Sequence, residues 1–248
     1  MNSPPSEMAA LCPHLDVCNG CPTMRVSYSE QVNAKQKMVQ NALQYYVEAF
    51  QMVPAESLSF YRNRADFWYD PTQKLGFRSK NDRFEGVEVP HCQLVSARAQ
   101  KLYSFLSDRV KTIGFESYSI LEQKGYLRYV VLRESKSTGK LLIALITFSR
   151  EHSIEMETLA NEMIEQKLTD GMVWMHHPGF NDSFDGEIVQ EWGEPLLTET
   201  LNGIPFVYNM KCFFQTNPRM AEKLQKYVID LVPEKNSVLD LYCGVGLF

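Results

Sequence analysis

The sequence lacks any long apolar run, and no stretch approaches the ~20 consecutive apolar residues that a membrane-spanning helix needs. Its first residues, Met1 to Glu7, include neither a basic cluster nor an apolar stretch, which argues against a secretory signal. Internal repeats and low-complexity tracts are absent as well. We therefore expect a globular cytoplasmic protein with no membrane partner, and the hydrophobic fraction of 44% fits that class.

Positive charge is not in excess either, because the formal net charge is −5, and this balance does not favour a polyanionic partner. The charge is unevenly spread, however, since residues 60–111 contain ten Lys or Arg residues against six Asp or Glu residues. A local basic face can attract a polyanion even on an acidic protein. A solvated surface of mixed charge is the simpler interpretation, and charge alone favours it.

Disulfides are not expected among the six cysteines, since thiols stay reduced in the cytoplasm. Three cysteines form a C-x5-C-x2-C pattern and a fourth lies far along the chain; these are Cys12, Cys18, Cys21 and Cys92. Four soft thiolates suit tetrahedral zinc or an iron–sulfur cluster, and a turn at Asn19-Gly20 would let two sulfurs converge. Spacing alone leaves zinc and iron–sulfur open, with four unrelated reduced cysteines as the structural alternative. His14 and His91 are close by in sequence, where surface or supporting roles are expected.

Periodicity predicts a mixture of helices and strands. Apolar residues at helical spacing, with N-caps at Ser29 and Asn217, predict helices over residues 29–50, 95–113, 153–167 and 218–232. Alternation and turn residues predict strands over residues 64–69, 74–78, 126–133, 140–148 and 172–176, with several short strands within 187–214.

The last segment, Ser237 to Phe248, predicts an apolar strand that enters a glycine-rich loop at Gly244 and Gly246. Such a strand normally leads to a helix and to further parallel strands. None follows, so we expect the chain to be part of a longer protein. The alternative is that this strand completes the sheet of the preceding domain.

Five motifs occur in a characteristic order: the cysteine pattern, Phe60 to Ala65, Pro90-His91-Cys92, Phe213 to Pro218, and Asp240 to Gly246. Together they resemble the bacterial 23S ribosomal RNA (uracil-C5)-methyltransferases, in the short type without an RNA-binding barrel before the cysteines. The resemblance covers nearly the whole chain from Cys12 onward.

The resemblance implies an α/β fold, in which an α+β central domain carries an iron–sulfur segment and precedes the start of a Rossmann-like S-adenosylmethionine (SAM) domain. The implied domains are a tail and ligand segment at residues 1–29, a helix packing on the methyltransferase domain at 30–56, the central domain at 57–212, and the start of the SAM-binding domain at 213–248.

Two cofactors are implied by the resemblance. A 4Fe–4S cluster would be held by the four cysteines, and it would have a structural or RNA-positioning role rather than a redox role. SAM would be bound by Gln215, Asp240, Tyr242, Gly244 and Gly246.

The implied partner is 23S ribosomal RNA, with no protein partner expected. Arg62, Arg64 and Phe213 are the candidate RNA contacts, and in a strand the two arginines would share one face. Transfer-RNA members of the wider family lack the cluster cysteines, which argues against a tRNA substrate.

The implied chemistry uses a Cys thiolate that adds to uracil C6, so that C5 attacks the SAM methyl group before a carboxylate removes the C5 proton. Neither Cys212 nor Cys243 matches that nucleophile. The catalytic Cys and Glu are expected beyond residue 248, so we predict that the 248-residue chain alone is inactive.

Two other functions are alternative interpretations of the cysteine pattern. A zinc-bound RNA-binding module without catalysis is the main alternative. A radical-SAM enzyme is disfavoured, because that class needs C-x3-C-x2-C and an open iron, whereas this chain offers a different spacing and a fourth cysteine.

Overall fold

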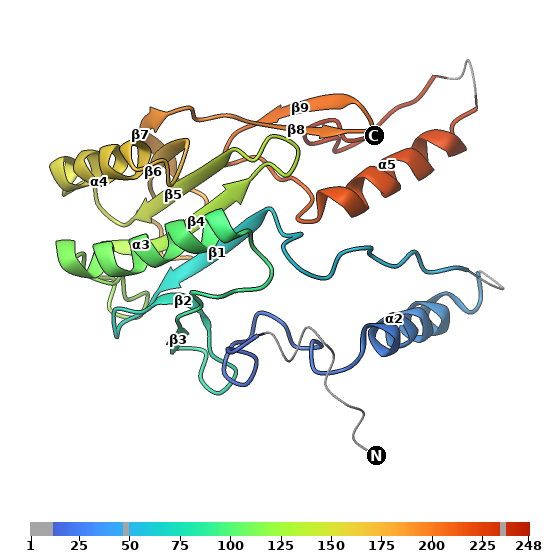
Figure 1. The fold of residues 1–248 in the computed structure, drawn as a ribbon, viewed down its shortest axis with the longest axis horizontal. Helices are drawn as coiled ribbons and strands as arrows, with labels where there is room; N and C mark the ends of the chain where they lie inside the picture. The colour runs from blue at the N-terminus through green and yellow to red at the C-terminus, as the bar shows by residue number, and fades with distance from the viewer. Residues whose placement is uncertain (1–11, 47–49, 234–236) are drawn as a thin grey trace.

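A seven-stranded mixed sheet forms the centre of the computed structural model, which describes residues 12–46, 50–233 and 237–248. The strand order is β3-β2-β1-β4-β5-β6-β7, and a separate two-stranded sheet pairs β8 with β9 (Figure 1). The helices are α2 (Tyr28–Leu43), α3 (Ala97–Ile113), α4 (Ser153–Glu165) and α5 (Pro218–Leu231). The strands are β1 (Arg64–Tyr69), β2 (Leu75–Arg78), β3 (Gly86–Val87), β4 (Leu127–Glu134), β5 (Leu141–Thr147), β6 (Gly171–His176), β7 (Glu187–Gly193), β8 (Leu197–Leu201) and β9 (Ile204–Tyr208).

One parallel pair interrupts an otherwise antiparallel sheet. β5 and β6 run parallel, with Leu142 opposite Gly171, and α4 provides the crossover that a parallel pair requires. The remaining neighbours are antiparallel, as in the β1–β4 pairing that places Trp68 opposite Tyr129. The predicted mixed α/β class is therefore confirmed, and so are the helices and strands predicted between residues 64 and 232.

The two faces of the sheet are covered differently. α3 and α4 cover one face (Figure 1), where Leu102, Leu106 and Met163 pack on inward residues of β1, β4 and β5. The opposite face packs against the β8–β9 sheet, Phe214 and the start of α5. Because successive residues of a strand point to opposite faces, Phe67 contacts the helical side and Trp68 the other.

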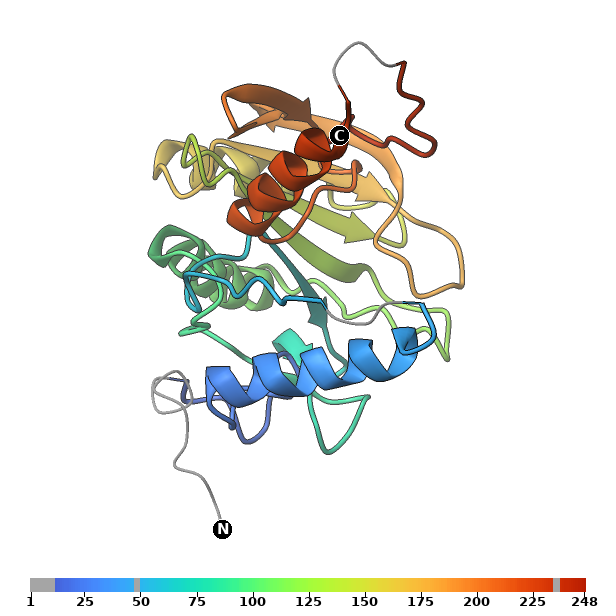
Figure 2. The same cartoon turned by 90° about the vertical axis from the view of Figure 1, so that its right-hand side faces the viewer.

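Local capping explains where the helices begin. Ser27, rather than the predicted Ser29, caps α2 through a reciprocal capping box with Glu30, because only Ser27 lies three residues before a carboxylate. Asn217 caps α5 as predicted, and Gly114 ends α3 in the left-handed conformation. α2 ends at Leu43 with no buried residue, and the rest of its predicted length includes residues 47–49, which lie outside the described ranges. Figure 2 shows α2 and α5 on the same side of the molecule, at opposite ends.

The strand predicted near the C-terminus is wrong for the residues described. Positions 237–240 have no regular structure, and Leu239 and Tyr242 are exposed. A strand needs a hydrogen-bonded neighbour, and no described strand pairs with this segment. The domain boundaries predicted after residues 29, 56 and 212 stay predictions. Among the described helices, none is both long and apolar enough to cross a membrane.

Buried tyrosines make the fold sensitive to alkaline pH. Burial, helped by the nearby Asp70 carboxylate, raises the pKa of Tyr69 to about 12, and burial also raises the pKa of Tyr103, Tyr126 and Tyr208. A tyrosine in the unfolded chain ionises near pH ~10, so this stability is present below pH ~10 and is lost as pH rises toward 12. We expect the urea midpoint to fall steeply over that window. Tyr69→Phe should flatten the fall, because the Tyr69 hydroxyl has no hydrogen-bond partner among the described residues; an unchanged pH profile would contradict this account.

Candidate functional site

The structure brings the four predicted cysteines to a single small cavity of about 20 Å³. Cys92 is buried, whereas the other three are half-buried. Apolar side chains complete the lining, among them Leu15, Met24, Phe77 and Val89. The segment of residues 12–24 and the segment around Cys92, far apart in the sequence, therefore meet at the edge of the sheet near β2.

Backbone hydrogen bonds hold the first cysteine segment against the end of β2. The Asn19 amide donates to the Arg78 carbonyl at 3.1 Å, and the Lys80 amide donates to the Val17 carbonyl at 2.8 Å. The Lys80 ammonium adds a bond of 2.6 Å to the Leu15 carbonyl. On the other side, the Gln100 side chain donates to the Cys92 carbonyl at 2.9 Å and ties this cysteine to α3.

The four thiols influence one another electrostatically. Burial, followed by the charges of Cys92, Cys18 and Cys12, raises the pKa of the Cys21 thiol to about 11. Burial is also the main cause that raises the pKa of Cys18 and of Cys92. Without metal the thiols of Cys18, Cys21 and Cys92 stay protonated at neutral pH, so metal binding would have to release protons.

Within the described ranges, no group of three or more His, Cys, Asp or Glu side chains is arranged to hold a metal ion. Tetrahedral zinc requires four ligands together, with sulfur ~2.3 Å from the ion, and a 4Fe–4S cluster also takes four thiolates, so the cysteines form no ready-made site for either. The predicted 4Fe–4S cluster is not confirmed. The donor chemistry still fits such a cluster, because four thiols share an apolar cavity and the Gly20 amide donates to the Cys18 Sγ at 3.3 Å. His14 also lines the cavity, and its Nε2 has no partner in the part of the chain described.

The residues predicted to bind SAM differ in their exposure. Gln215 is half-buried, and its carbonyl accepts a bond of 2.9 Å from the buried Asn63 side chain at the start of β1. Asp240, Tyr242 and Gly244 are exposed. Tyr242, Gly244 and Gly246 all have positive φ, which suits tight turns, although positive φ is unusual for tyrosine.

The two phenylalanines before Gln215 differ in how deeply their side chains are buried. Phe214 is 3% exposed and stacks on Tyr208 at 4.6 Å between ring centroids, whereas Phe213 is 69% exposed. Phe214 is therefore a core residue, and Phe213 is the member of the pair that is free to contact RNA. The same core cluster includes Leu247, whose carbonyl accepts a bond of 2.7 Å from the Gln225 side chain.

The two candidate RNA arginines do not lie in one strand, so the expectation of a shared strand face does not apply to them, and their roles as RNA contacts stay predictions. β1 begins at Arg64, so Arg62 precedes the strand; burial raises the pKa of Cys21 and Cys92, and the charge of Arg62 offsets only a small part of that rise. Arg64 instead forms an ion pair of 2.7 Å with Asp66. Arg62 thus lies beside the cysteines, and Arg64 is already paired.

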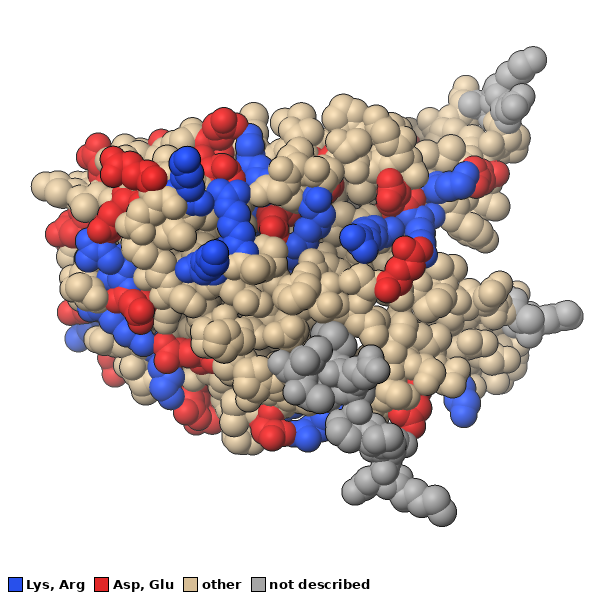
Figure 3. All heavy atoms as spheres, viewed as in Figure 1, with Lys and Arg blue, Asp and Glu red and all other residues tan. Residues whose placement is uncertain are grey.

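The locally basic segment of residues 60–111 is largely neutralised. Six of its ten basic residues form ion pairs: Arg64, Lys74, Arg78, Arg98, Arg109 and Lys111. Figure 3 shows Lys and Arg interspersed with Asp and Glu on the visible face, without one continuous basic patch. The mixed-charge interpretation therefore describes this face.

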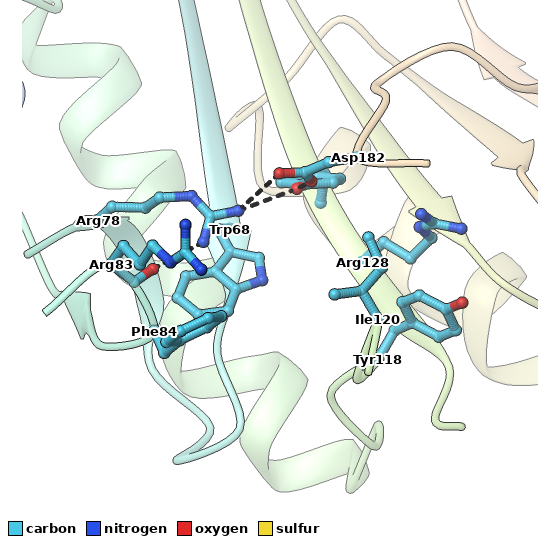
Figure 4. Close-up of a pocket in the computed structure, with 9 residues that line it drawn as sticks. Trp68, Arg78, Arg83, Phe84, Tyr118, Ile120, Arg128 and Asp182 are labelled. Carbon is cyan, nitrogen blue, oxygen red and sulfur yellow. Dashed lines mark hydrogen bonds and ion pairs between the residues drawn. The ribbon is translucent and has the colours of Figure 1, made fainter. Parts of the chain in front are cut away.

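Sequence reasoning missed a second cavity, of about 270 Å³, on the sheet face opposite α3 and α4. Trp68, Arg78, Arg83 and Phe84 form one side (Figure 4), and Tyr118, Ile120 and Arg128 form the other. Arg78 forms an ion pair of 3.0 Å with Asp182, which lies between the two sides. The only signal in the sequence is the outward position of Trp68 in an alternating strand, because the other residues come from separate segments.

No family model matches the chain. The curated proteins similar to it include RNA (uracil-C5)-methyltransferases that act on tRNA or on 23S rRNA. One is the tRNA (uracil(54)-C(5))-methyltransferase of Pyrococcus furiosus, 29% identical over 248 residues, which cover 100% of this chain and 57% of that protein. Another is the 23S rRNA (uracil(747)-C(5))-methyltransferase RlmC of Vibrio vulnificus, 28% identical over 254 residues, which cover 96% of this chain and 65% of that protein.

A solved structure of another RNA (uracil-C5)-methyltransferase is also similar to this chain. The tRNA (uracil-54, C5)-methyltransferase of Pyrococcus abyssi in complex with S-adenosyl-L-homocysteine matches 93% of this chain with a TM-score of 0.80 and 26% identity. The match covers 54% of that protein. The chain thus spans a little over half the length of the first of these relatives. Relatives of both RNA classes occur at similar identity, so the predicted choice of 23S rRNA over tRNA is not confirmed.

Proposed function

We propose that this chain takes part in methylating the C5 carbon of a uridine in RNA, with SAM as the methyl donor and 23S rRNA as the substrate. The observation that carries the proposed reaction is the match of 93% of the chain, at a TM-score of 0.80, to a tRNA (uracil-54, C5)-methyltransferase in complex with S-adenosyl-L-homocysteine; the choice of 23S rRNA does not rest on it. S-adenosyl-L-homocysteine is the product that remains when SAM has lost its methyl group. The reaction needs neither a membrane nor a secreted location, and we place it in the cytoplasm.

Transfer RNA is the second candidate substrate. Three of the similar proteins, all from Pyrococcus species, are named for uridine 54 of tRNA. The argument for 23S rRNA rests on the resemblance of the cysteine pattern, which is independent of overall identity. An assay that offers both RNAs therefore decides between the two substrates.

The chain contributes two parts to the proposed reaction. Gln215, Asp240, Tyr242, Gly244 and Gly246 would contact SAM, which supplies an electrophilic methyl group when it is bound. The four cysteines would hold a 4Fe–4S cluster that ties residues 12–21 to the segment around Cys92. Closing so long a loop reduces the conformational entropy of the unfolded chain, so the cluster would act on stability and RNA positioning.

The test is a tritium-release assay, because methylation replaces the hydrogen on C5. Transcripts of 23S rRNA and of tRNA carrying tritium at uridine C5 are incubated with SAM and with the product of the whole gene, including any coding sequence after residue 248. We expect tritium in water from the rRNA transcript only, and no release without SAM. Release from tRNA alone would show that tRNA is the substrate in place of 23S rRNA. Release from neither RNA would overturn the proposed function.

The 248-residue chain is expected to release no tritium in the same assay. By the resemblance, the nucleophilic cysteine and the catalytic carboxylate lie beyond residue 248. The two cysteines near the SAM motifs are poor substitutes, because the Cys212 thiol already contacts Asn209 Oδ1 at 3.2 Å and Cys243 is exposed, with only the neighbouring Gly244 carbonyl near its sulfur. Tritium release by the 248-residue chain would place the catalytic residues within it and would contradict this assignment.

A further inference from the structure

The cavity of Figure 4 combines aromatic rings with arginines in a repeated arrangement. Arg78 lies over the Trp68 ring at 4.3 Å, Arg83 over the Phe84 ring at 4.7 Å, and Arg128 over the Tyr118 ring at 4.3 Å. A ring face that its arginine does not cover can stack on a planar group, and a guanidinium nitrogen that has no partner can pair with an anion. A flat, anionic ligand matches both properties.

A buried cation on one side of the cavity forms no ion pair with another described residue. Arg128 is 2% exposed, and its terminal nitrogens donate to the backbone carbonyls of His177, Gly179 and Asn181 at 2.6–2.8 Å. Its Nε has no hydrogen-bond partner among the described residues, and the same holds for the hydroxyl of Tyr118, which is 4% exposed. A buried cation that forms no ion pair, at the wall of a cavity whose one carboxylate, Asp182, is already paired with Arg78, favours an anionic ligand.

The opposite side of the cavity adds an exposed, unpaired arginine. Arg83 belongs to no ion pair within the described ranges, unlike six of the other basic residues between 60 and 111. Arg78 is paired with Asp182, which also accepts a hydrogen bond from Tyr129. Three arginines against one aspartate leave the cavity with an excess of positive charge.

The cavity opens on the sheet face that also carries the proposed SAM segments. Trp68 and Tyr129 pack with the cluster that includes Phe214, Leu247 and Val245, which flank or belong to the two motifs. A ligand in the cavity would therefore lie on the same side of the sheet as the reaction. The volume of about 270 Å³ is at the lower end of ligand pockets, so it suits one nucleotide rather than a large ligand.

We propose that this cavity binds a single unpaired nucleotide of the RNA substrate, away from the methylated uridine, with the base on Trp68 or Phe84 and a phosphate on Arg83 and Arg78. This inference rests on the proposed function, because it takes RNA to be the substrate. Single-stranded RNA is recognised by this combination of aromatic stacking and arginine contacts. Asp182 competes with the phosphate for Arg78 and weakens binding.

The experiment measures the affinity of the full gene product for a short fluorescein-labelled single-stranded RNA by anisotropy, at several salt concentrations. Phe84→Ala should weaken binding about tenfold, and Phe84→Tyr should restore it, since stacking requires only an aromatic face. Arg83→Ala should lower the slope of log affinity against log salt by about 0.7, the value for one lost phosphate contact on a single strand. Asp182→Asn should strengthen binding severalfold, which a damaged fold would not do.

Matched controls lie on the helical face of the sheet. Lys101→Ala removes one positive charge from an exposed site on α3, and Ile154→Ala removes an apolar side chain that is 76% exposed on α4. Both should bind RNA as the unaltered protein does. If the unaltered protein binds RNA and releases tritium while the cavity variants bind equally well, the cavity proposal is overturned and the proposed function stands. If the unaltered protein neither binds nor methylates RNA, both are overturned.

Discussion

Replacing Cys18 by alanine is expected to abolish the proposed iron–sulfur cluster and to lower the amount of soluble protein. Cys18 lines the cavity that it shares with Cys12, Cys21 and Cys92, and its sulfur accepts the Gly20 amide. A cluster with four protein ligands loses a ligand in this variant, and the loop between residue 21 and residue 92 is then no longer closed. Anaerobically purified protein should be brown, with absorbance near ~400 nm, whereas the variant should be colourless.

The control for this variant is Cys243→Ala, because Cys243 is an exposed cysteine outside the cavity. It should retain colour, iron and solubility. Colour and iron retained by Cys18→Ala would remove this cysteine from the ligand set. A colourless unaltered protein that contains zinc would favour the zinc-bound module, which the described residues do not support as a preformed site.

Replacing Asp70 by alanine is expected to destabilise the whole edge of the sheet. This carboxylate is fully buried, and it accepts bonds from the amides of Thr72 at 2.9 Å, Lys74 at 2.8 Å and Gly86 at 2.7 Å. It therefore joins the turn between β1 and β2 to the start of β3. Leaving these amides without an acceptor should lower the free energy of unfolding by about 3 kcal/mol or more, and for a chain of this size each kcal/mol lowers Tm by roughly 2–4 °C.

Two variants calibrate the Asp70 result. Asp82→Ala removes an aspartate from the exposed loop between β2 and β3, where it accepts only the Phe84 amide at 2.8 Å, and it should cost less than about 1 kcal/mol. Asp70→Asn keeps the shape but loses the charge, so it should give an intermediate loss. Thermal and urea unfolding give the free energy of unfolding of all three variants. Equal stability of Asp70→Ala and Asp82→Ala would show that the buried carboxylate does not organise this edge.

Most helices and strands could be predicted because their signals are local. The alternation in residues 64–69, the cap at Asn217 and the glycine after α3 act over a few residues and need no distant partner. The strand predicted near residue 238 failed for the opposite reason. Its apolar residues indicate a buried strand, but a strand depends on neighbours, and no described strand pairs with it.

The candidate site was predictable only in its chemistry. Four cysteines with a characteristic spacing indicated soft ligands, and the structure places them around one cavity. The roles of the arginines were not predictable in this way, because β1 begins at Arg64, two residues after Arg62, so the two arginines do not lie in one strand. The nucleotide cavity was missed because its residues come from β1, β2, β4 and three loops.

The sequence by itself determined the positions of most elements and the set of sulfur ligands, since hydrogen bonding within a helix, capping and side-chain alternation act between near neighbours. Tertiary structure alone decided that Cys92 meets the first three cysteines, that Phe214 rather than Phe213 is buried, and that Trp68, Phe84 and Arg128 surround one cavity. These outcomes depend on which strands pair and in which register. That choice is set by packing across the whole sheet, which no short stretch of sequence encodes.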